Sequence, residues 1–181
     1  ILSNPIHVFA PAEIQARALR SEPAPPEPAA PPLIREIVDD FDAAHLRPAW
    51  QVDKSAGAEG RVAPDGGALR FDFALAGEAR SHSSFCDFTE RDLTAHRSLR
   101  FRVRSDRPLR FDVQVRTLDD GAPAGVRVWR RSIRAGSEWD QVALPLESLG
   151  TYDRRGGHPD LRRVRGLYFH LDEANLPPGS R

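Results

Sequence analysis

Alternation of apolar and charged residues is the feature that most constrains the fold of this chain. In the stretch SLRFRVRSDRPLRFDVQVR, residues 98–116, apolar residues alternate with arginines from Leu99 to Arg104, and the alternation resumes at Leu109. Side chains two residues apart lie on the same face of a β-strand, so each run is typical of a strand with one apolar and one polar face. The stretch therefore predicts two strands joined by a turn over Ser105–Pro108.

Short runs of the same kind fill the chain after about Leu33 and are separated by turn residues such as PDGG at 64–67 and DDGAPAG at 119–125. No long segment has the periodicity of a helix. The predicted strands are Glu36–Phe41, Ala49–Asp53, Gly60–Ala63, Ala68–Ala76, Ser83–Phe88, Ser98–Arg104, Leu109–Thr117, Val126–Ile133, Asp140–Pro145 and Val164–Leu171. Many short strands at this spacing favour an all-β fold, a two-sheet antiparallel sandwich.

A proline-rich segment divides the chain into three regions. SEPAPPEPAAPP, residues 21–32, favours polyproline II, so we expect a linker that is either disordered or a semi-rigid spacer. Residues 33–181 form the predicted β domain. Residues 1–20 form an extended N-terminal arm, whose apolar side chains need either the domain or another protein to pack on. The candidate docking residues of this arm are Ile1, Leu2, Ile6, Val8, Phe9 and Ile14.

Charge and hydropathy exclude several classes of partner. The chain has 26 basic and 26 acidic residues and a formal net charge of zero, so we expect no nucleic-acid partner. No apolar run reaches the roughly 18 residues of a membrane span, which predicts no transmembrane segment in this chain. The sequence begins at Ile1 rather than Met, which favours a cleaved leader and an extracytoplasmic location, periplasmic or secreted.

Catalytic motifs are missing from the sequence, and we expect no enzyme. It contains no glycine-rich phosphate loop, no G-x-S-x-G turn and no H-E-x-x-H pair. The stretch SHSSFCDF brings His82 close to the single cysteine, Cys86, but neighbouring strand residues mostly point apart. Cys86 is therefore expected to be a buried apolar residue rather than a nucleophile.

Carboxylates cluster in the segment VDDFDAA at Asp39, Asp40 and Asp42. If the first and last strands are neighbours, these oxygens are candidates for a structural Ca²⁺; otherwise they are ordinary turn carboxylates. No other cofactor is expected.

The alternation also assigns an outer face to the strands. In VRVWRRSI, residues 126–133, taking Val126 and Val128 as core places Trp129 on the outer face among arginines. Trp129 is then an aromatic platform for a sugar or a partner side chain; otherwise the strand bulges there, or the outer face is covered by a loop or by the arm. If the strands share one sheet, its outer surface is a ligand-binding face, a polar protein interface or a solvated surface. The predicted face comprises Arg70, Asp72, Arg102, Asp112, Gln114, Arg116, Trp129, Tyr168 and His170.

The order of motifs resembles the galactose-binding-like β-jelly-roll superfamily. The motifs are DDFD at 39–42, GGALRFDFAL at 66–75, DLTAHRSLRFRVRS at 92–105, EWDQVALPLESL at 138–149 and VRGLYFHLDEANLPPG at 164–179. Within the superfamily, the chain is most similar to carbohydrate-binding modules associated with cellulases and to the complex I intermediate-associated protein domain. The resemblance implies two antiparallel sheets and no catalysis.

For the sugar-binding members, the resemblance also implies a groove over one sheet. Asp112, Arg116, Trp129, Tyr168 and His170 would fall near this groove. The sequence departs from those members in having only two tyrosines. The resemblance further implies one more strand after residues 175–180. Either this strand lies beyond residue 181, or another segment fills its place in the sheet.

Two functions are compatible with these features. The arm, the spacer and the low aromatic content favour a non-catalytic interaction or structural subunit, which would tether the jelly-roll domain to a larger, membrane-bound extracytoplasmic protein complex. The alternative is a carbohydrate-binding module that recognises a polysaccharide on one sheet face, which Trp129 and the mixed polar face favour.

Overall fold

The computed structural model describes residues 36–41, 47–77, 79–122, 124–151 and 156–176. The chain divides into two units, Ile1–Leu33 and Ile34–Arg181, and the described residues belong to the second. The predicted docking arm and linker therefore lie outside the described residues. Within the described part, no helix is long and apolar enough to cross a lipid bilayer.

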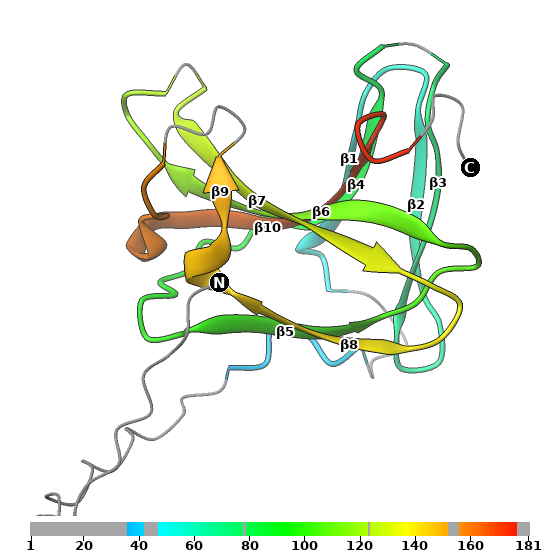
Figure 1. Ribbon diagram of the computed structural model, residues 1–181, viewed down its shortest axis with the longest axis horizontal. Helices are drawn as coiled ribbons and strands as arrows, with labels where there is room; N and C mark the ends of the chain where they lie inside the picture. The colour runs from blue at the N-terminus through cyan, green and yellow to red at the C-terminus, as the bar shows by residue number, and fades with distance from the viewer. Residues whose placement is uncertain (1–35, 42–46, 78, 123, 152–155, 177–181) are drawn as a thin grey trace, which may run out of the picture. The chain divides into compact units, whose positions relative to one another are not determined.

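The second unit is built from antiparallel β-strands (Figure 1). The strands are β1 (Trp50–Lys54), β2 (Glu59–Pro64), β3 (Leu69–Ala74), β4 (His82–Asp87), β5 (Ser98–Val103), β6 (Leu109–Leu118), β7 (Val126–Ala135), β8 (Asp140–Pro145), β9 (Gly150–Thr151) and β10 (Val164–Asp172). Two 3-10 helices, η1 (Leu146–Ser148) and η2 (Leu161–Arg163), lie at the two ends of the connection between β8 and β10.

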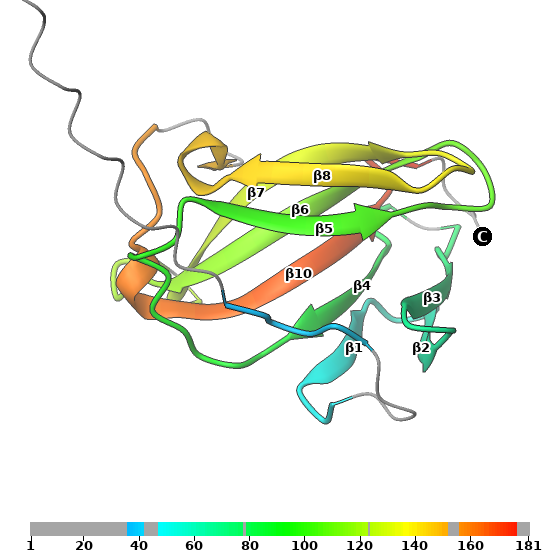
Figure 2. The same ribbon diagram turned by 90° about the horizontal axis from the view of Figure 1, so that it is seen from below.

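The strands form one large sheet and two smaller ladders. The six-stranded sheet has the order β1-β4-β10-β6-β7-β9, while β2 pairs with β3 and β5 pairs with β8. In Figure 1 the β5–β8 ladder lies as a separate layer below β6 and β10, and Figure 2 shows it in front of them when the view is from below. The predicted all-β jelly-roll sandwich is confirmed.

Phenylalanines join the three ladders at the centre of the sandwich. Phe85 of β4 and Phe169 of β10 are paired across the large sheet, and their rings stack with centroids 4.5 Å apart. Phe101 of β5 meets Phe169 edge-on at 5.2 Å, and Phe71 of β3 lies 5.2 Å from Phe85. The inner faces of both small ladders therefore pack on the same face of the large sheet, which leaves the other face of that sheet pointing outward.

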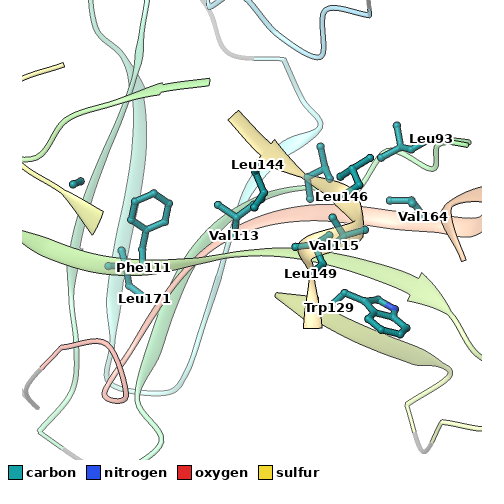
Figure 3. Close-up of a cluster of buried hydrophobic side chains, with 12 residues drawn as sticks. Leu93, Phe111, Val113, Val115, Trp129, Leu144, Leu146, Leu149, Val164 and Leu171 are labelled. Atoms are coloured by element: carbon teal, nitrogen blue, oxygen red, sulfur yellow. The ribbon is translucent and has the colours of Figure 1, made fainter. Parts of the chain in front are cut away.

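Trp129 belongs to the core, and the prediction that it lies on the outer face is wrong. Its side chain is only 3% exposed, it pairs with Val115 across the ladder, and its indole N–H donates to Thr117 Oγ1 at 3.0 Å. Figure 3 shows it in one cluster with Val115 and Leu149. The error came from assigning Val128 to the core: Val128 pairs with Arg116 on the outer face, because the large indole fills the interior better than a valine does.

The segment Glu36–Phe41 was predicted as a strand and has irregular structure instead. The Asp39 carboxylate accepts hydrogen bonds from the Phe41 backbone N–H at 2.9 Å and from the Trp50 indole at 2.8 Å. A turn built around an aspartate competes in this way with ladder formation. The other predicted strands are present within two residues of their predicted ends, and the short strand β9 was not predicted.

Candidate functional site

The outer side of the six-stranded sheet carries a continuous set of polar side chains. One row across the strands consists of Asp53, Ser84, His170, Asp112 and Ser132, and the next row of Gln51, Cys86, Tyr168, Gln114 and Arg130. These two rows, together with His82, Arg116 and Asp172, are called the polar face below. Residues that alternate with them, such as Val113 and Leu167, are buried in the core.

The floor of the polar face is buried and internally bonded. Ser84 and Asp112 are fully buried and Gln114 is 1% exposed. The Asp112 carboxylate accepts hydrogen bonds from the Arg130 guanidinium and from the Ser132 hydroxyl. Because a buried charge is costly unless it is paired in this way, the pair fixes the position of the Arg130 side chain, which is 29% exposed at the surface.

From β6, Arg116 extends its guanidinium over Tyr168 of β10 towards Asp53 of β1. Its guanidinium carbon is 3.5 Å from the centroid of the Tyr168 ring, and its terminal nitrogen is 3.8 Å from Asp53 Oδ2 and 3.4 Å from Gln114 Oε1. Its Nε is buried and has no hydrogen-bond partner in the described structure. The side chain is 24% exposed, so the guanidinium is held in place while one part of it faces solvent.

Tyr168 is covered and not free to stack on a ligand. The Arg116 guanidinium lies over its ring, and Phe88 meets the ring edge-on at 5.6 Å. Burial raises the pKa of the phenol, so Tyr168 stays protonated at neutral pH. Since Trp129 is also in the core, the polar face itself offers hydrogen-bonding groups, and Phe88, which is 43% exposed, lies at its margin against Tyr168.

Two histidines extend the polar face towards the edge at which β4 begins and β10 ends. His170 Nδ1 is 2.8 Å from Ser84 Oγ and its Nε2 is 3.3 Å from Asp172 Oδ2. The ring of His82 lies 5.4 Å from that of His170, and its Nε2 is 3.9 Å from Asp53 Oδ1. Burial raises the pKa of Asp172, but hydrogen bonds, that of His170 foremost, outweigh this and hold the pKa below its usual value. Asp172 is therefore a carboxylate acceptor at neutral pH.

Cys86 lies on the floor of the polar face, and its thiol is unreactive at neutral pH. It is fully buried, and its Sγ is 3.4 Å from the Gln51 carbonyl oxygen. Burial raises the pKa of the thiol to about 12. A thiol with this pKa is not a nucleophile at neutral pH, which confirms the predicted buried cysteine.

The proposed calcium ligands are only partly within the described residues. Asp39 Oδ2 accepts from the Trp50 indole and lies 3.4 Å from Arg47 Nε, so this oxygen already has two partners. Asp42 lies outside the described residues, and the calcium hypothesis stays a prediction. Among the residues that the structure describes, no group of three or more His, Cys, Asp and Glu side chains is arranged to hold a metal ion.

Three residues of the predicted face lie elsewhere. Arg70 and Asp72 are on β3, where they pair with each other at 3.2 Å, and Arg102 is on β5. The condition that the strands of the whole set share one sheet is not met, because alternation assigns a residue to a face but not to a ladder. The structure does bring together Asp112, Gln114, Arg116, Tyr168 and His170.

The polar face contains residues that sequence reasoning missed. Arg130 and Ser132 alternate with Trp129, so the correct orientation of Trp129 would have placed both of them on the outer face. Next to them, a hollow of about 330 Å³ at the β7–β9 edge continues the polar face. It is lined by Arg130, Arg131, Ser132, Ser148, Gly150 and Thr151.

The domain is similar in structure to family 11 carbohydrate-binding modules. One is the module of a cellulosomal cellulase of Clostridium thermocellum, with a TM-score of 0.57 and 16% identity over 78% of this chain and 86% of that chain. The other is a module from Clostridium thermocellum in complex with a β-1,3-1,4-mixed-linked tetrasaccharide, with a TM-score of 0.58 and 16% identity over 78% of this chain and 87% of that chain. The likeness confirms the predicted jelly-roll fold. No protein-family model and no curated protein matches the sequence.

Proposed function

We propose that this chain is a non-catalytic polysaccharide-binding module and that its ligand lies across the polar face. The observation that carries the proposal is the position of Arg116, whose partly exposed guanidinium is held between Tyr168 and Asp53 with a buried N–H left over. A fixed cationic donor beside carboxylates suits a ligand rich in hydroxyl groups. The fold shared with a module bound to a mixed-linked tetrasaccharide supports this choice of ligand.

The polar face offers both of the hydrogen-bonding functions that a sugar needs. Sugar hydroxyls accept hydrogen bonds from the guanidiniums of Arg116 and Arg130 and donate to the carboxylates of Asp53 and Asp172. Hydrogen bonds to charged groups are about twice as strong as those between neutral groups. The buried floor holds these groups before a ligand arrives, so little side-chain entropy is lost on binding.

The shortage of free aromatic rings on the polar face determines the kind of binding we expect. With Phe88 as a partly exposed ring at the margin of the polar face, affinity still comes mainly from hydrogen bonds, so binding is driven by enthalpy and opposed by entropy. We therefore expect modest affinity for short oligosaccharides and higher affinity for longer chains that reach from His82 to the hollow beside Arg130.

Titration calorimetry with a soluble mixed-linked β-glucan tetrasaccharide tests the proposal. We expect Arg116→Ala to weaken binding by at least about tenfold, since one charged hydrogen bond contributes about 1.5–3 kcal/mol. Arg70→Ala is the matched control, because Arg70 lies on β3 outside the polar face. A folded domain that binds no β-glucan oligomer, or an equal loss in both variants, would refute the proposal.

Tethering to a membrane-bound protein complex stays a prediction from the sequence. It rests on the arm from Ile1 to Arg20, which lies outside the described residues. The extracytoplasmic location stays a prediction as well, and it is compatible with a module that binds a polysaccharide.

A further inference from the structure

The outer surface of the β5–β8 ladder carries a cluster of arginines around a tryptophan. Leu99, Phe101 and Val103 pack against the core, so the alternating Arg100, Arg102 and Arg104 point away from it. The guanidinium carbons of Arg102 and Arg104 lie 5.2 Å and 4.9 Å from the centroid of the Trp139 ring. Trp139 is 42% exposed and immediately precedes β8. Arg100, Arg102, Arg104 and Trp139 are called the arginine cluster below.

The arginine cluster has no counter-ion within the described part of the chain. No carboxylate there lies within 4.0 Å of the guanidinium of Arg100, Arg102 or Arg104. Some other surface arginines of the domain are paired, as Arg127 is with Asp119 and Arg165 with Glu90. Two cations held against one ring repel each other, and an arriving anion relieves that repulsion.

The spacing of the arginine cluster favours a linear anionic polymer. Alternate residues of a strand are about 6.6–7 Å apart, so the cluster presents a row of positive charges rather than a single point. A guanidinium binds a carboxylate through two parallel hydrogen bonds. Trp139 fixes two of the guanidiniums by cation–π contact and leaves part of its ring open to the face or edge of a sugar.

Nucleic acid and acidic protein fit the arginine cluster less well. Single-stranded nucleic acid is bound by several stacking aromatic rings within a basic groove, whereas Trp139 is the one aromatic residue in this cluster and the chain has zero net charge. An acidic peptide would use the charges, but its carboxylates make no use of the indole. A polysaccharide with a carboxylate on its sugar rings uses both.

We propose that the arginine cluster is a second binding site, for a polysaccharide that contains uronic acid. The choice of a polysaccharide rests on the proposed function, but the residues do not overlap the polar face, which lies on the opposite side of the sandwich. Arg102 and Arg104 bind the carboxylates, Arg100 extends the row, and Trp139 positions the guanidiniums. The domain then has one face for neutral and one for acidic polysaccharide.

Binding of oligogalacturonate, measured by calorimetry at low and at physiological salt, tests the second site. We expect the double variant Arg102→Gln, Arg104→Gln to weaken oligogalacturonate binding by at least tenfold and to reduce its salt dependence. The double variant Arg61→Gln, Arg134→Gln is the matched control, because it removes the same charge from exposed positions on β2 and β7. We expect less than a twofold effect there.

Trp139→Leu separates positioning from charge, because it leaves all three guanidiniums in the chain. We expect it to weaken oligogalacturonate binding several-fold, and unchanged affinity would refute the role of Trp139. The second site is refuted if the wild type does not bind oligogalacturonate at low salt, if both double variants lose binding equally, or if oligoglutamate or single-stranded DNA binds more tightly. The wild type and the variants are also titrated with mixed-linked β-glucan, which keeps the two proposals apart. If the wild type binds oligogalacturonate but not β-glucan, only the polar-face proposal is refuted.

Discussion

Replacing Trp129 tests whether the core has been assigned correctly. Its side chain is 3% exposed and one of its contacts is the hydrogen bond to Thr117 Oγ1. A buried tryptophan removes about 150–250 Å² from water, which at about 25 cal/mol per Å² corresponds to about 4–6 kcal/mol. Trp129→Ala is therefore expected to lower the free energy of unfolding by about 3–5 kcal/mol, a large part of the total stability of a domain of this size.

A milder change keeps the experiment interpretable if Trp129→Ala does not fold. Trp129→Phe keeps a large ring but leaves the buried Thr117 hydroxyl without its donor, which predicts a loss of about 2–3 kcal/mol. Thr117→Val removes the acceptor, and the double variant is expected to lose less than the sum of the two single losses because both remove the same hydrogen bond.

Urea unfolding followed by circular dichroism measures these losses. The wild type and the variants are then titrated with β-glucan at a temperature where all are folded. A Trp129→Ala variant with unchanged stability, or a folded variant that loses only glucan binding, would refute the core position and restore Trp129 as a surface platform.

Three further predictions follow from single contacts. Burial raises the pKa of Asp87, but hydrogen bonds from Thr89 and Arg91 outweigh this and hold the pKa below its usual value. The Asp87 carboxylate therefore stabilises the fold above about pH 4, and this stabilisation is lost as the pH falls. The difference in the free energy of unfolding between wild type and Asp87→Asn, measured by urea unfolding, should become smaller from about pH 7 to about pH 3. Cys86, with its pKa raised to about 12 by burial, should not react with a thiol reagent at pH 8 until urea unfolds the domain, and rapid native labelling would contradict its burial. Gly166→Ala places a Cβ 2.9 Å from the Asp87 carbonyl oxygen and should cost about 1–3 kcal/mol, whereas Gly150→Ala meets nothing within 4 Å and should be close to neutral.

Strand positions were readable from the sequence because burial on one face imposes a period of two. The run from Leu99 to Val103 illustrates this, since every second residue packs on the core. In VRVWRR each face carries both apolar side chains and arginines, so the pattern does not decide which face is buried. Only the space available inside the sandwich decides that Trp129 points inward. The segment Glu36–Phe41 was misassigned because the Asp39 side chain satisfies backbone and indole donors locally.

The candidate site could be predicted only in part from the sequence, because a site on a sheet depends on the order of the strands. Asp112, Arg116 and His170 were identified from alternation alone. Their neighbours Ser84 and Arg130 come from β4 and β7, and the order β4-β10-β6-β7 is not encoded in any local pattern. Sequence spacing carries no information about such long-range pairing, so cross-strand partners emerge only with the structure.

The order in which the strands are made has a consequence for how the domain folds in the cell. The last strand, β10, lies between β4 and β6 at the centre of the large sheet. While the ribosome is still synthesising earlier residues, β4 and β6 have no strand to join them, and their edges are open to pairing with another chain. The large sheet therefore cannot close until the chain up to residue 172 is available. Slow synthesis between β8 and β10 would lengthen the period in which aggregation competes with folding.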